Sequence, residues 1–291
     1  MSDPTSTPSR SAEDAQSAKA PDRARAETVS LDRCDDLGNG YFRLTFRAER
    51  PIRGRAGHFA MIRSETWGQA PLLARPMSLL RAGDRPAMLI KVVGEGTRRM
   101  AAAQPGERFS LLAPLGTPWR HPAAGERAIL VAGGVGLPPV LLLARELGAS
   151  STEGASGVPP IALYGGRSAA DLPLADELAQ CSDTRLATED GSRGAEGFVT
   201  TLLAEAIAEC RQQGAAPAVY ACGPQAMLGA VAQIAAEHRA ACQVSLEALM
   251  GCGYGVCLGC PTPRTGGGYL YTCTEGPCVD AGEIAWTEVS S

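Results

Sequence analysis

Four cysteines near the end of the chain constrain its fold and chemistry more than any other feature. Cys252, Cys257 and Cys260 have the spacing C-x4-C-x2-C, and Cys273 follows after twelve intervening residues. A compact cysteine loop with a distant fourth thiolate is typical of a plant-type [2Fe–2S] centre, which transfers one electron at a time. Turning backbone N–H groups toward sulfide requires residues that tolerate positive φ, and glycine does so best. Glycines stand in this loop at positions 251, 253, 255 and 259.

Other interpretations of these cysteines remain open. A structural zinc site more often has paired C-x2-C knuckles, whereas only Cys257 and Cys260 have that spacing here. Free cysteines also pack as small hydrophobic residues. Cys278 is a further candidate ligand, but it follows Gly276-Pro277, a turn signal that carries the chain away from the loop. We therefore predict Cys273 as the fourth ligand.

Composition narrows the function classes. The 291 residues include 45% hydrophobic residues, enough for two or three domains with sizeable cores. The formal charge of −4 argues against binding to nucleic acid, which requires clustered cations. The ten cysteines occur without a visible signal peptide, and no apolar run is long enough to span a bilayer. We therefore predict a cytoplasmic protein without a membrane segment.

The sequence divides into regions that differ in their pattern of apolar residues. Residues 1–26 lack Leu, Ile, Val and aromatic residues, so they cannot offset ordering entropy by burial and are predicted to be a disordered tail. Between residues 27 and 122, short apolar runs are broken by Gly and Pro. Phe42–Phe46, His58–Ile62 and Met88–Val93 have the pattern of strands. A small antiparallel β barrel is the simplest architecture for this region.

Residues 123–242 alternate between predicted strands and helices. Ala128–Ala132, Ile161–Tyr164 and Ala218–Ala221 are short apolar strands separated by helical stretches. This alternation predicts an α/β domain, an open parallel sheet with helices on both faces. Residues 243–291 would then form a small cluster module.

Two loops at the predicted carboxyl edge of that sheet suggest a nucleotide cleft. Gly133-Gly134-Val135-Gly136 lies between a strand and a helix, where open α/β sheets bind ligands. Pro138-Pro139 supports a helix that begins there. Ala221-Cys222-Gly223-Pro224 ends a later strand at the same edge. Either loop taken separately is also compatible with an ordinary turn, but together they favour a cleft.

Two polar motifs lie within the region predicted to form the barrel. Arg75-Pro76-Met77-Ser78 offers an arginine for a pyrophosphate and a hydroxyl for the edge of a flavin ring. Gly94-Glu95-Gly96-Thr97 offers backbone N–H groups to phosphate at a helix start. Each motif also occurs as an ordinary surface turn.

From the barrel motifs to the last cysteine, the chain resembles the electron-transfer subunit of heterodimeric, NAD-linked dihydroorotate dehydrogenase, a family within the ferredoxin–NADP reductase superfamily. The resemblance is carried, in order, by RPMS, GEGT, APLG, AGGVGLPP, TEDGSRGAEGFVT, YACGP, SLEALMGCGYGVCLGC and CTEGP. It implies a ferredoxin-reductase-like FAD barrel at 27–122, an NAD-binding α/β domain at 123–242 and a [2Fe–2S] module at 243–291.

The resemblance also implies roles for individual residues. Ser78 would contact the isoalloxazine ring of FAD, and Cys222 would lie near the nicotinamide ring. These two are the expected catalytic residues. The residues implied to bind FAD are Arg75, Pro76, Met77, Ser78, Leu89, Ile90, Lys91, Gly96 and Thr97. Those implied for NAD are Gly133, Gly134 and Gly136, and the cluster ligands are Cys252, Cys257, Cys260 and Cys273. Two positions depart from the family pattern: Lys91 often aligns with arginine, and Cys278 with an apolar residue.

The implied function is electron transfer in pyrimidine biosynthesis. A partner subunit with FMN would oxidise dihydroorotate to orotate, and electrons would reach NAD through the [2Fe–2S] cluster and FAD, the cofactor that exchanges both hydride and single electrons. A heterotetramer with that catalytic subunit is expected. The chain lacks the roughly 250 residues of a TIM-type FMN barrel. Two alternatives stay open: a related NAD(P)H reductase serving ferredoxin, sulfur or another acceptor, and a non-enzymatic metal-binding scaffold.

Overall fold

The computed structural model describes residues 24–150 and 158–289. Most of the predicted disordered tail therefore lies outside the described residues. Its expected end at residue 26 differs from the structure, because strand β1 begins at Arg25. Arg25 and Ala26 pair with Ala113 and Leu112 of β6, and this backbone pairing holds the start of the strand in the barrel.

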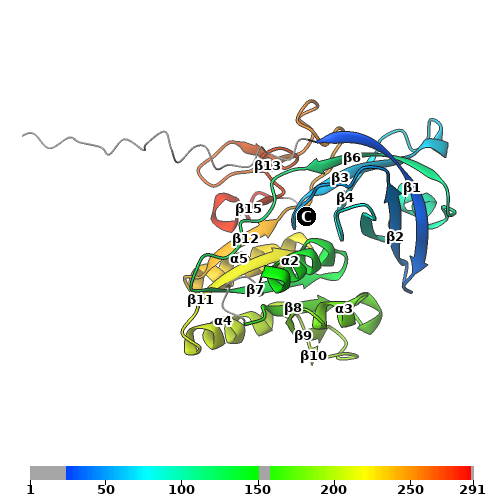
Figure 1. The fold of residues 1–291 in the computed structure, drawn as a ribbon. Helices are drawn as coiled ribbons and strands as arrows, with labels where there is room; N and C mark the ends of the chain where they lie inside the picture. Colours follow the sequence, from blue (N-terminus) through cyan, green and yellow to red (C-terminus); the bar gives the residue numbers. More distant parts are fainter. Residues whose placement is uncertain (1–23, 151–157, 290–291) are drawn as a thin grey trace, which may run out of the picture.

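Six antiparallel strands form the predicted barrel, in the order β4-β3-β6-β1-β2-β5. The edge strands β4 and β5 contact each other, and the sheet is strongly curved (Figure 1). Alternating residues such as Leu44, Phe46 and Ile62 fill its interior, where Phe46 meets Phe109 edge to face with ring centroids 5.3 Å apart. The strands are β1 (Arg25–Asp36), β2 (Tyr41–Ala48), β3 (Phe59–Ser64), β4 (Arg75–Ser78), β5 (Ala87–Lys91) and β6 (Arg108–Leu115).

A seven-stranded sheet follows in the order β10-β9-β8-β7-β11-β12-β15, parallel except at its last edge. The chain thus winds outward in both directions from β7, and the carboxyl ends of β7 and β11 are neighbours. The strands are β7 (Glu126–Gly133), β8 (Ile161–Gly166), β9 (Asp183–Thr188), β10 (Ala195–Glu196), β11 (Ala216–Cys222), β12 (Ala241–Ser245) and β15 (Cys278–Asp280).

Side-chain alternation along β7 explains why helices cover both faces of this sheet. Leu130 packs in the core that contains α2 and the barrel, whereas Ile129 and Val131 pack in the core that contains α4 and α5. The predicted α/β architecture is therefore confirmed. The helices are α1 (Glu95–Ala101), α2 (Leu137–Ser150), α3 (Ala175–Ala179), α4 (Leu203–Gln212) and α5 (Gln225–Glu237), with 3-10 turns η1 (Glu65–Trp67), η2 (Gly134–Gly136), η3 (Ala169–Asp171), η4 (Val199–Leu202) and η5 (Ala281–Glu283). Within the described ranges, no helix has the length and apolar character to cross a membrane.

The C-terminal segment is less separate than the sequence suggested. The expected boundary at residue 243 falls inside β12, and β15 returns from the cysteine region to pair with β12, with Ser245 opposite Cys278. This pairing satisfies backbone groups that β12 would otherwise expose at the sheet edge. The hairpin of β13 (Pro261–Pro263) and β14 (Tyr269–Tyr271) lies beyond this edge (Figure 1).

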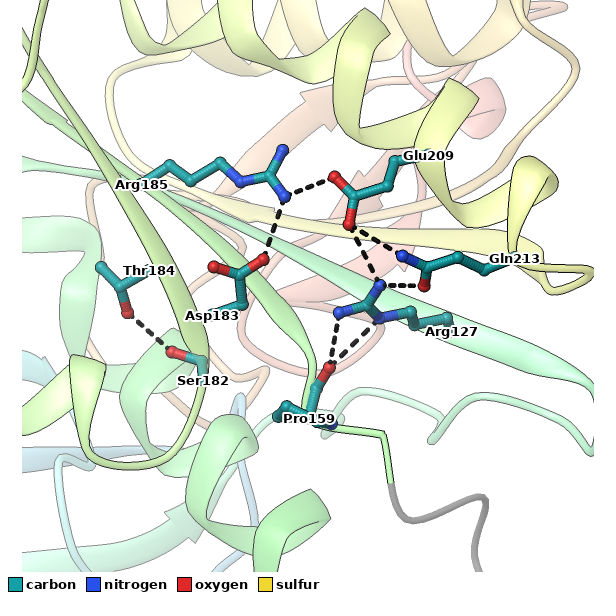
Figure 2. Close-up of polar contacts among 8 residues, drawn as sticks. All are labelled: Arg127, Pro159, Ser182, Asp183, Thr184, Arg185, Glu209 and Gln213. Carbon is teal, nitrogen blue, oxygen red and sulfur yellow. Dashed lines mark hydrogen bonds and ion pairs between the residues drawn. The ribbon is translucent and has the colours of Figure 1, made fainter.

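A polar network braces the amino edge of the parallel sheet, away from the predicted cleft. Arg127 of β7 donates to the carbonyl oxygen of Pro159 (Nη2–O 3.1 Å) and to Gln213 beside α4 (Nη1–Oε1 2.6 Å), and Glu209 of α4 pairs with Arg185 of β9 (Figure 2). Arg127 is buried, so these bonds replace its lost hydration. The network links α4 to β7 and β9.

Candidate cofactor sites

The cysteine loop 250–260 turns backbone N–H groups toward sulfur. The Cys252 thiol accepts hydrogen bonds from the backbone of Tyr254 and of Cys257, both with N–Sγ distances of 3.5 Å. Burial opposes ionisation of Cys252, but these bonds outweigh it and lower its pKa to about 6. The loop thus favours the thiolate that iron requires.

Two of the four loop glycines have the predicted positive φ. Gly253 lies at φ +82° and Gly255 at φ +86°, and a Cβ at Gly253 would overlap the Met61 side chain. Gly251 and Gly259 do not have positive φ. A Cβ at these two positions would instead lie 3.3 and 3.5 Å from the Cys257 sulfur, so they provide close approach rather than a left-handed turn. Leu258, which the sequence did not single out, has φ +55°.

The four predicted ligands form two neighbouring pairs. Cys252 lies beside Cys257, and Cys273 donates its backbone N–H to the Cys260 sulfur over 3.5 Å. Burial, then the Cys260 thiol, raises the pKa of Cys273 to about 12. Among the described residues, no group of three or more His, Cys, Asp or Glu side chains forms a site for a metal ion. Two adjacent thiol pairs fit a centre with two irons, each taking two thiolates.

Cys278 lies in a different environment from these four. It stands in β15 next to Ser245, and its sulfur occupies the space that a Cβ on Gly57 would need. Burial raises its pKa well above the usual value. Cys278 packs in the barrel-side core with Cys222, whereas Cys260 and Cys273 share a separate apolar cluster.

A cavity of about 230 Å³ lies between the barrel, the nucleotide sheet and the cysteine segment. Seven of the nine residues predicted for FAD line it: Pro76, Met77, Ser78, Leu89, Ile90, Lys91 and Thr97. Because the residues expected to bind FAD line it, we call it the flavin pocket. Arg75 and Gly96 do not line this cavity, but they lie against each other, because a Cβ on Gly96 would overlap the Arg75 guanidinium. This contact brings the Arg75 cation to the first turn of α1, which suits a phosphate group.

A second cavity of about 650 Å³ opens at the carboxyl edge of the parallel sheet, and we call it the dinucleotide pocket. Of the three glycines expected to bind NAD, Gly133 and Gly134 line this cavity and Gly136 does not. Gly136 instead packs under the β11 end, where a Cβ would overlap the Cys222 carbonyl oxygen. Its glycine serves close helix–strand packing. Cys222, expected near the nicotinamide ring, lines the flavin pocket and not the dinucleotide pocket.

The sequence did not predict several of the contributions to these cavities. Tyr41 was not predicted as a site residue and Lys91 was predicted for FAD alone, yet both line the dinucleotide pocket, where Lys91 Nζ lies 2.7 Å from Asp171 Oδ1. Glu247 lines both pockets. Its side chain is exposed to the solvent of the pockets. Barrel residues gave no signal for this pocket because only the domain arrangement brings them there.

These geometric features define a class, a two-domain reductase with an appended iron–sulfur module. Residues 247–285 match the model of the iron-sulfur cluster binding domain of dihydroorotate dehydrogenase B, and residues 130–233 match the oxidoreductase NAD-binding domain. The probable electron transfer subunit of dihydroorotate dehydrogenase B (NAD(+)) from Methanopyrus kandleri is 37% identical over 248 residues, covering 84% of each chain. The Bacillus caldolyticus electron transfer subunit is 35% identical over 221 residues, 74% of this chain and 80% of that protein.

Solved structures support the same architecture. An NADH-dependent reduced ferredoxin–NADP oxidoreductase superimposes with a TM-score of 0.73 at 21% identity, covering 89% of this chain and 90% of that one. The ferredoxin reductase of carbazole 1,9a-dioxygenase gives a TM-score of 0.62 at 21% identity, over 74% and 66% of the two chains. The chain belongs to the family of electron transfer subunits of dihydroorotate dehydrogenase B (NAD(+)). The predicted family, oxidoreductase class and cofactor set of [2Fe–2S] cluster, FAD and NAD are supported by these matches.

Proposed function

We propose that this chain transfers electrons from dihydroorotate oxidation in a catalytic partner to NAD+. The electrons pass through three adjacent sites: the cysteine cluster, the flavin pocket and the dinucleotide pocket. The main observation in support is that the flavin pocket has lining residues in common with each of the other two sites. When bound, flavin exchanges hydride with nicotinamide and single electrons with an iron–sulfur centre, so it belongs between them.

The first shared wall separates the flavin pocket from the cysteine cluster. Phe59, Ala248 and Met250 line the flavin pocket and also belong to the apolar cluster around Cys260 and Cys273. A single layer of side chains therefore stands between the two sites. These apolar groups also keep water away from the buried cysteine pair.

The second shared wall separates the flavin and dinucleotide pockets. Lys91, Val135 and Glu247 line both cavities. In this proposal Arg75 and the α1 start hold the flavin phosphates, Ser78 contacts the ring edge, and Gly133 and Gly134 allow close approach of the dinucleotide pyrophosphate.

The outer side of the cysteine loop suits a docking surface for the partner. Cys257 is exposed while Cys260 and Cys273 are buried, so one end of the cluster site faces outward. The loop and its flank expose apolar side chains that a monomer would normally bury: Leu249 is 90% exposed and Val256 72% exposed, with Tyr254 and Leu258 also exposed. We propose that an FMN-containing catalytic subunit covers this surface, in a heterotetramer.

We also propose a cytoplasmic location. All ten cysteines of the chain fall within the described residues and are free thiols, as expected in a reducing compartment.

Copurification with a dihydroorotate-oxidising chain, followed by a dihydroorotate:NAD+ assay, tests the proposal. We expect a stable complex that forms NADH, and Val256→Asp at the loop surface should weaken assembly without loss of flavin or cluster absorbance. A complex that reduces NAD+ no faster than the isolated partner would contradict the proposal and favour another electron acceptor. Absence of flavin and iron–sulfur absorbance would favour the scaffold alternative.

A further inference from the structure

Three buried polar side chains stand in register across neighbouring strands of the nucleotide sheet. Cys222 at the end of β11 pairs with Ser245 at the end of β12, and Ser245 pairs with Cys278 at the start of β15. Directly paired residues of adjacent strands project from the same face of a sheet. Cys222, Ser245 and Cys278 therefore form one line of side chains, which we call the thiol row.

The thiol row faces the barrel. Cys222 and Cys278 pack in the barrel-side core. Val244 and Val279, each one residue away along its strand, pack in the core that contains α4 and α5, as strand alternation requires. The Cys278 sulfur fills the space that a Cβ on Gly57 would need, so the glycine in the segment before β3 makes room for this thiol.

One end of the thiol row opens on the flavin pocket, and the other end is closed. Cys222 and Ser245 line that pocket, whereas Cys278 does not. All three side chains are buried. Among the described residues, the hydrogen-bonding partner of the Cys278 sulfur is the Ser245 hydroxyl alone. Cys278 can therefore influence the pocket only through Ser245.

Both thiols of the row keep their protons. Burial raises the pKa of Cys278 well above its usual value, and hydrogen bonding with Ser245 offsets only part of this effect. Burial likewise raises the pKa of Cys222, against a smaller opposing effect of Ser245. Each sulfur thus carries an S–H donor. The Ser245 hydroxyl has a single proton, so it can donate to only one of the two sulfurs and accepts from the other.

The closed end of the row determines the direction of these hydrogen bonds. The Cys278 S–H has Ser245 as its acceptor, so the Ser245 proton is available to the Cys222 sulfur. The Cys222 S–H is then left for the open end of the row. The reverse order would leave the Cys278 S–H unpaired in the core, which makes it the less stable arrangement.

We propose that Cys278 and Ser245 are positioning residues that direct the Cys222 S–H into the flavin pocket. The inference rests on the proposed function, in which flavin occupies this pocket and exchanges hydride with nicotinamide. A disulfide between the two cysteines is excluded, because β12 stands between them and two strand spacings separate their Cα atoms by about 10 Å, beyond disulfide range. The row therefore acts through hydrogen bonds and not through thiol oxidation.

Infrared spectroscopy of the holoprotein measures the Cys222 thiol directly, because S–H stretching bands lie apart from other protein bands. The band that is absent from Cys222→Ala identifies it. We expect this band to shift in the wild type when NAD+ is added. In Cys278→Ala, Ser245 accepts from Cys222 instead, so the band should move to lower frequency and stop responding to NAD+. Cys278→Ser should keep the wild-type band, because a hydroxyl can donate in place of the thiol.

Stopped-flow reduction of flavin by NADH gives a second measurement. Cys278→Ala should lower the limiting rate constant roughly fivefold, the effect of one neutral hydrogen bond, with the half-saturating NADH concentration unchanged. Adding Ser245→Ala to this variant should restore the response of the band to NAD+ and most of the rate, since no hydroxyl then captures the Cys222 S–H. A double variant that stays as slow as Cys278→Ala would contradict the role given to Ser245.

Cys210→Ala is the matched control. Cys210 is a buried thiol like Cys278, but it packs in the core that contains α4 and α5 and lines neither pocket. We expect the wild-type band and rate in this variant. A Cys222 band unchanged in Cys278→Ala, or shifted equally in Cys210→Ala, would overturn the positioning role of the thiol row. A wild-type holoprotein whose flavin is not reduced by NADH would instead contradict the proposed function.

Discussion

Lys91 of the barrel and Asp171 of the nucleotide domain form an ion pair across the domain boundary, with Nζ and Oδ1 2.7 Å apart. The same Asp171 oxygen accepts hydrogen bonds from Asn39 (2.9 Å) and Tyr41 (3.3 Å), both from the barrel. Burial opposes ionisation of Asp171, but the bonds from Lys91 and Tyr41 outweigh it, so its pKa is lowered. One carboxylate therefore accepts hydrogen bonds from three barrel residues, two of which, Tyr41 and Lys91, line the dinucleotide pocket with it.

Asp171→Asn should reduce the free energy of unfolding by about 1–2 kcal/mol at pH 7, since a charge-assisted contact becomes a neutral one. Because the folded-state pKa is lowered, the contribution of this carboxylate is fully present above the unfolded value and is lost as pH falls through the folded one. Denaturant unfolding measures the difference in unfolding free energy between the wild type and Asp171→Asn. This difference should be the same at pH 7 and pH 5 and smaller at pH 3.

Asp176→Asn serves as the control for that series. Asp176 pairs with Arg193 on the surface, where its side chain is 88% exposed, so the loss should stay below about 0.5 kcal/mol. Equal effects of the two substitutions would argue that the interdomain carboxylate has no special role.

The sequence predicted local features better than it predicted contacts between domains. The apolar runs around Leu44 and Leu130 identify strands because their burial follows strand periodicity. The turn at Gly134 was predictable because it joins a strand to a helix. Lys91 and Tyr41, in contrast, reach the dinucleotide pocket only because of how the barrel sits on the sheet, and no periodicity encodes that arrangement.

The role of individual glycines and cysteines also depended on the fold. Gly134 and Gly136 are equivalent in sequence, yet the first lines the pocket and the second packs under the Cys222 carbonyl. The Gly276-Pro277 turn did indicate that Cys278 leaves the cysteine loop. The pairing of β15 with β12 was not predictable, since a three-residue strand has too little pattern to identify.

Arg75→Ala should weaken FAD binding by about 2 kcal/mol, roughly thirtyfold, through loss of a charge-assisted phosphate contact. Arg75 is oriented by a hydrogen bond from Nη1 to the Leu73 carbonyl oxygen (2.8 Å) and by its packing against Gly96. Flavin content after gel filtration and fluorescence titration of FAD measure the change.

Arg99→Ala is the matched control for Arg75, because the Arg99 guanidinium is already paired with Glu95 and Arg99 does not line the flavin pocket. It should retain flavin. Normal flavin occupancy in Arg75→Ala, or equal losses in both variants, would count against a phosphate contact at Arg75.

Gly134→Ala should slow the reduction of flavin by NADH roughly tenfold, with FAD and cluster absorbance preserved. Gly134 has φ +50°, a conformation that costs an L-residue about 1–2 kcal/mol, and the new methyl group would lie 3.3 Å from the Tyr41 hydroxyl at the pocket floor. Stopped-flow absorbance measures the rate. Wild-type NADH kinetics in folded Gly134→Ala would exclude close pyrophosphate approach at this turn.

Gly136→Ala should instead impair folding, because its methyl group would overlap the backbone at Cys222.

Cys257→Ser should remove or severely destabilise the [2Fe–2S] centre, because a hard oxygen ligand poorly replaces a soft thiolate on iron. The flavin pocket contains none of the Cys257 atoms among its lining residues, so FAD should remain bound. Flavin reduction by NADH should survive, whereas electron transfer with the catalytic partner should collapse. Electron paramagnetic resonance of the dithionite-reduced protein measures the cluster, and stopped-flow absorbance measures flavin reduction.

Cys278→Ser and Cys273→Ser test which cysteine supplies the fourth thiolate. Cys278 lies in β15 beside Ser245 and packs near Gly57, apart from the apolar cluster that holds Cys260 and Cys273. Cys278→Ser should therefore keep the paramagnetic signal and partner activity near those of the wild type, while Cys273→Ser should lose both. A signal that disappears in Cys278→Ser and persists in Cys273→Ser would reverse the assignment. That result would require the Cys278 sulfur to leave the barrel-side core, where it now occupies the space beside Gly57.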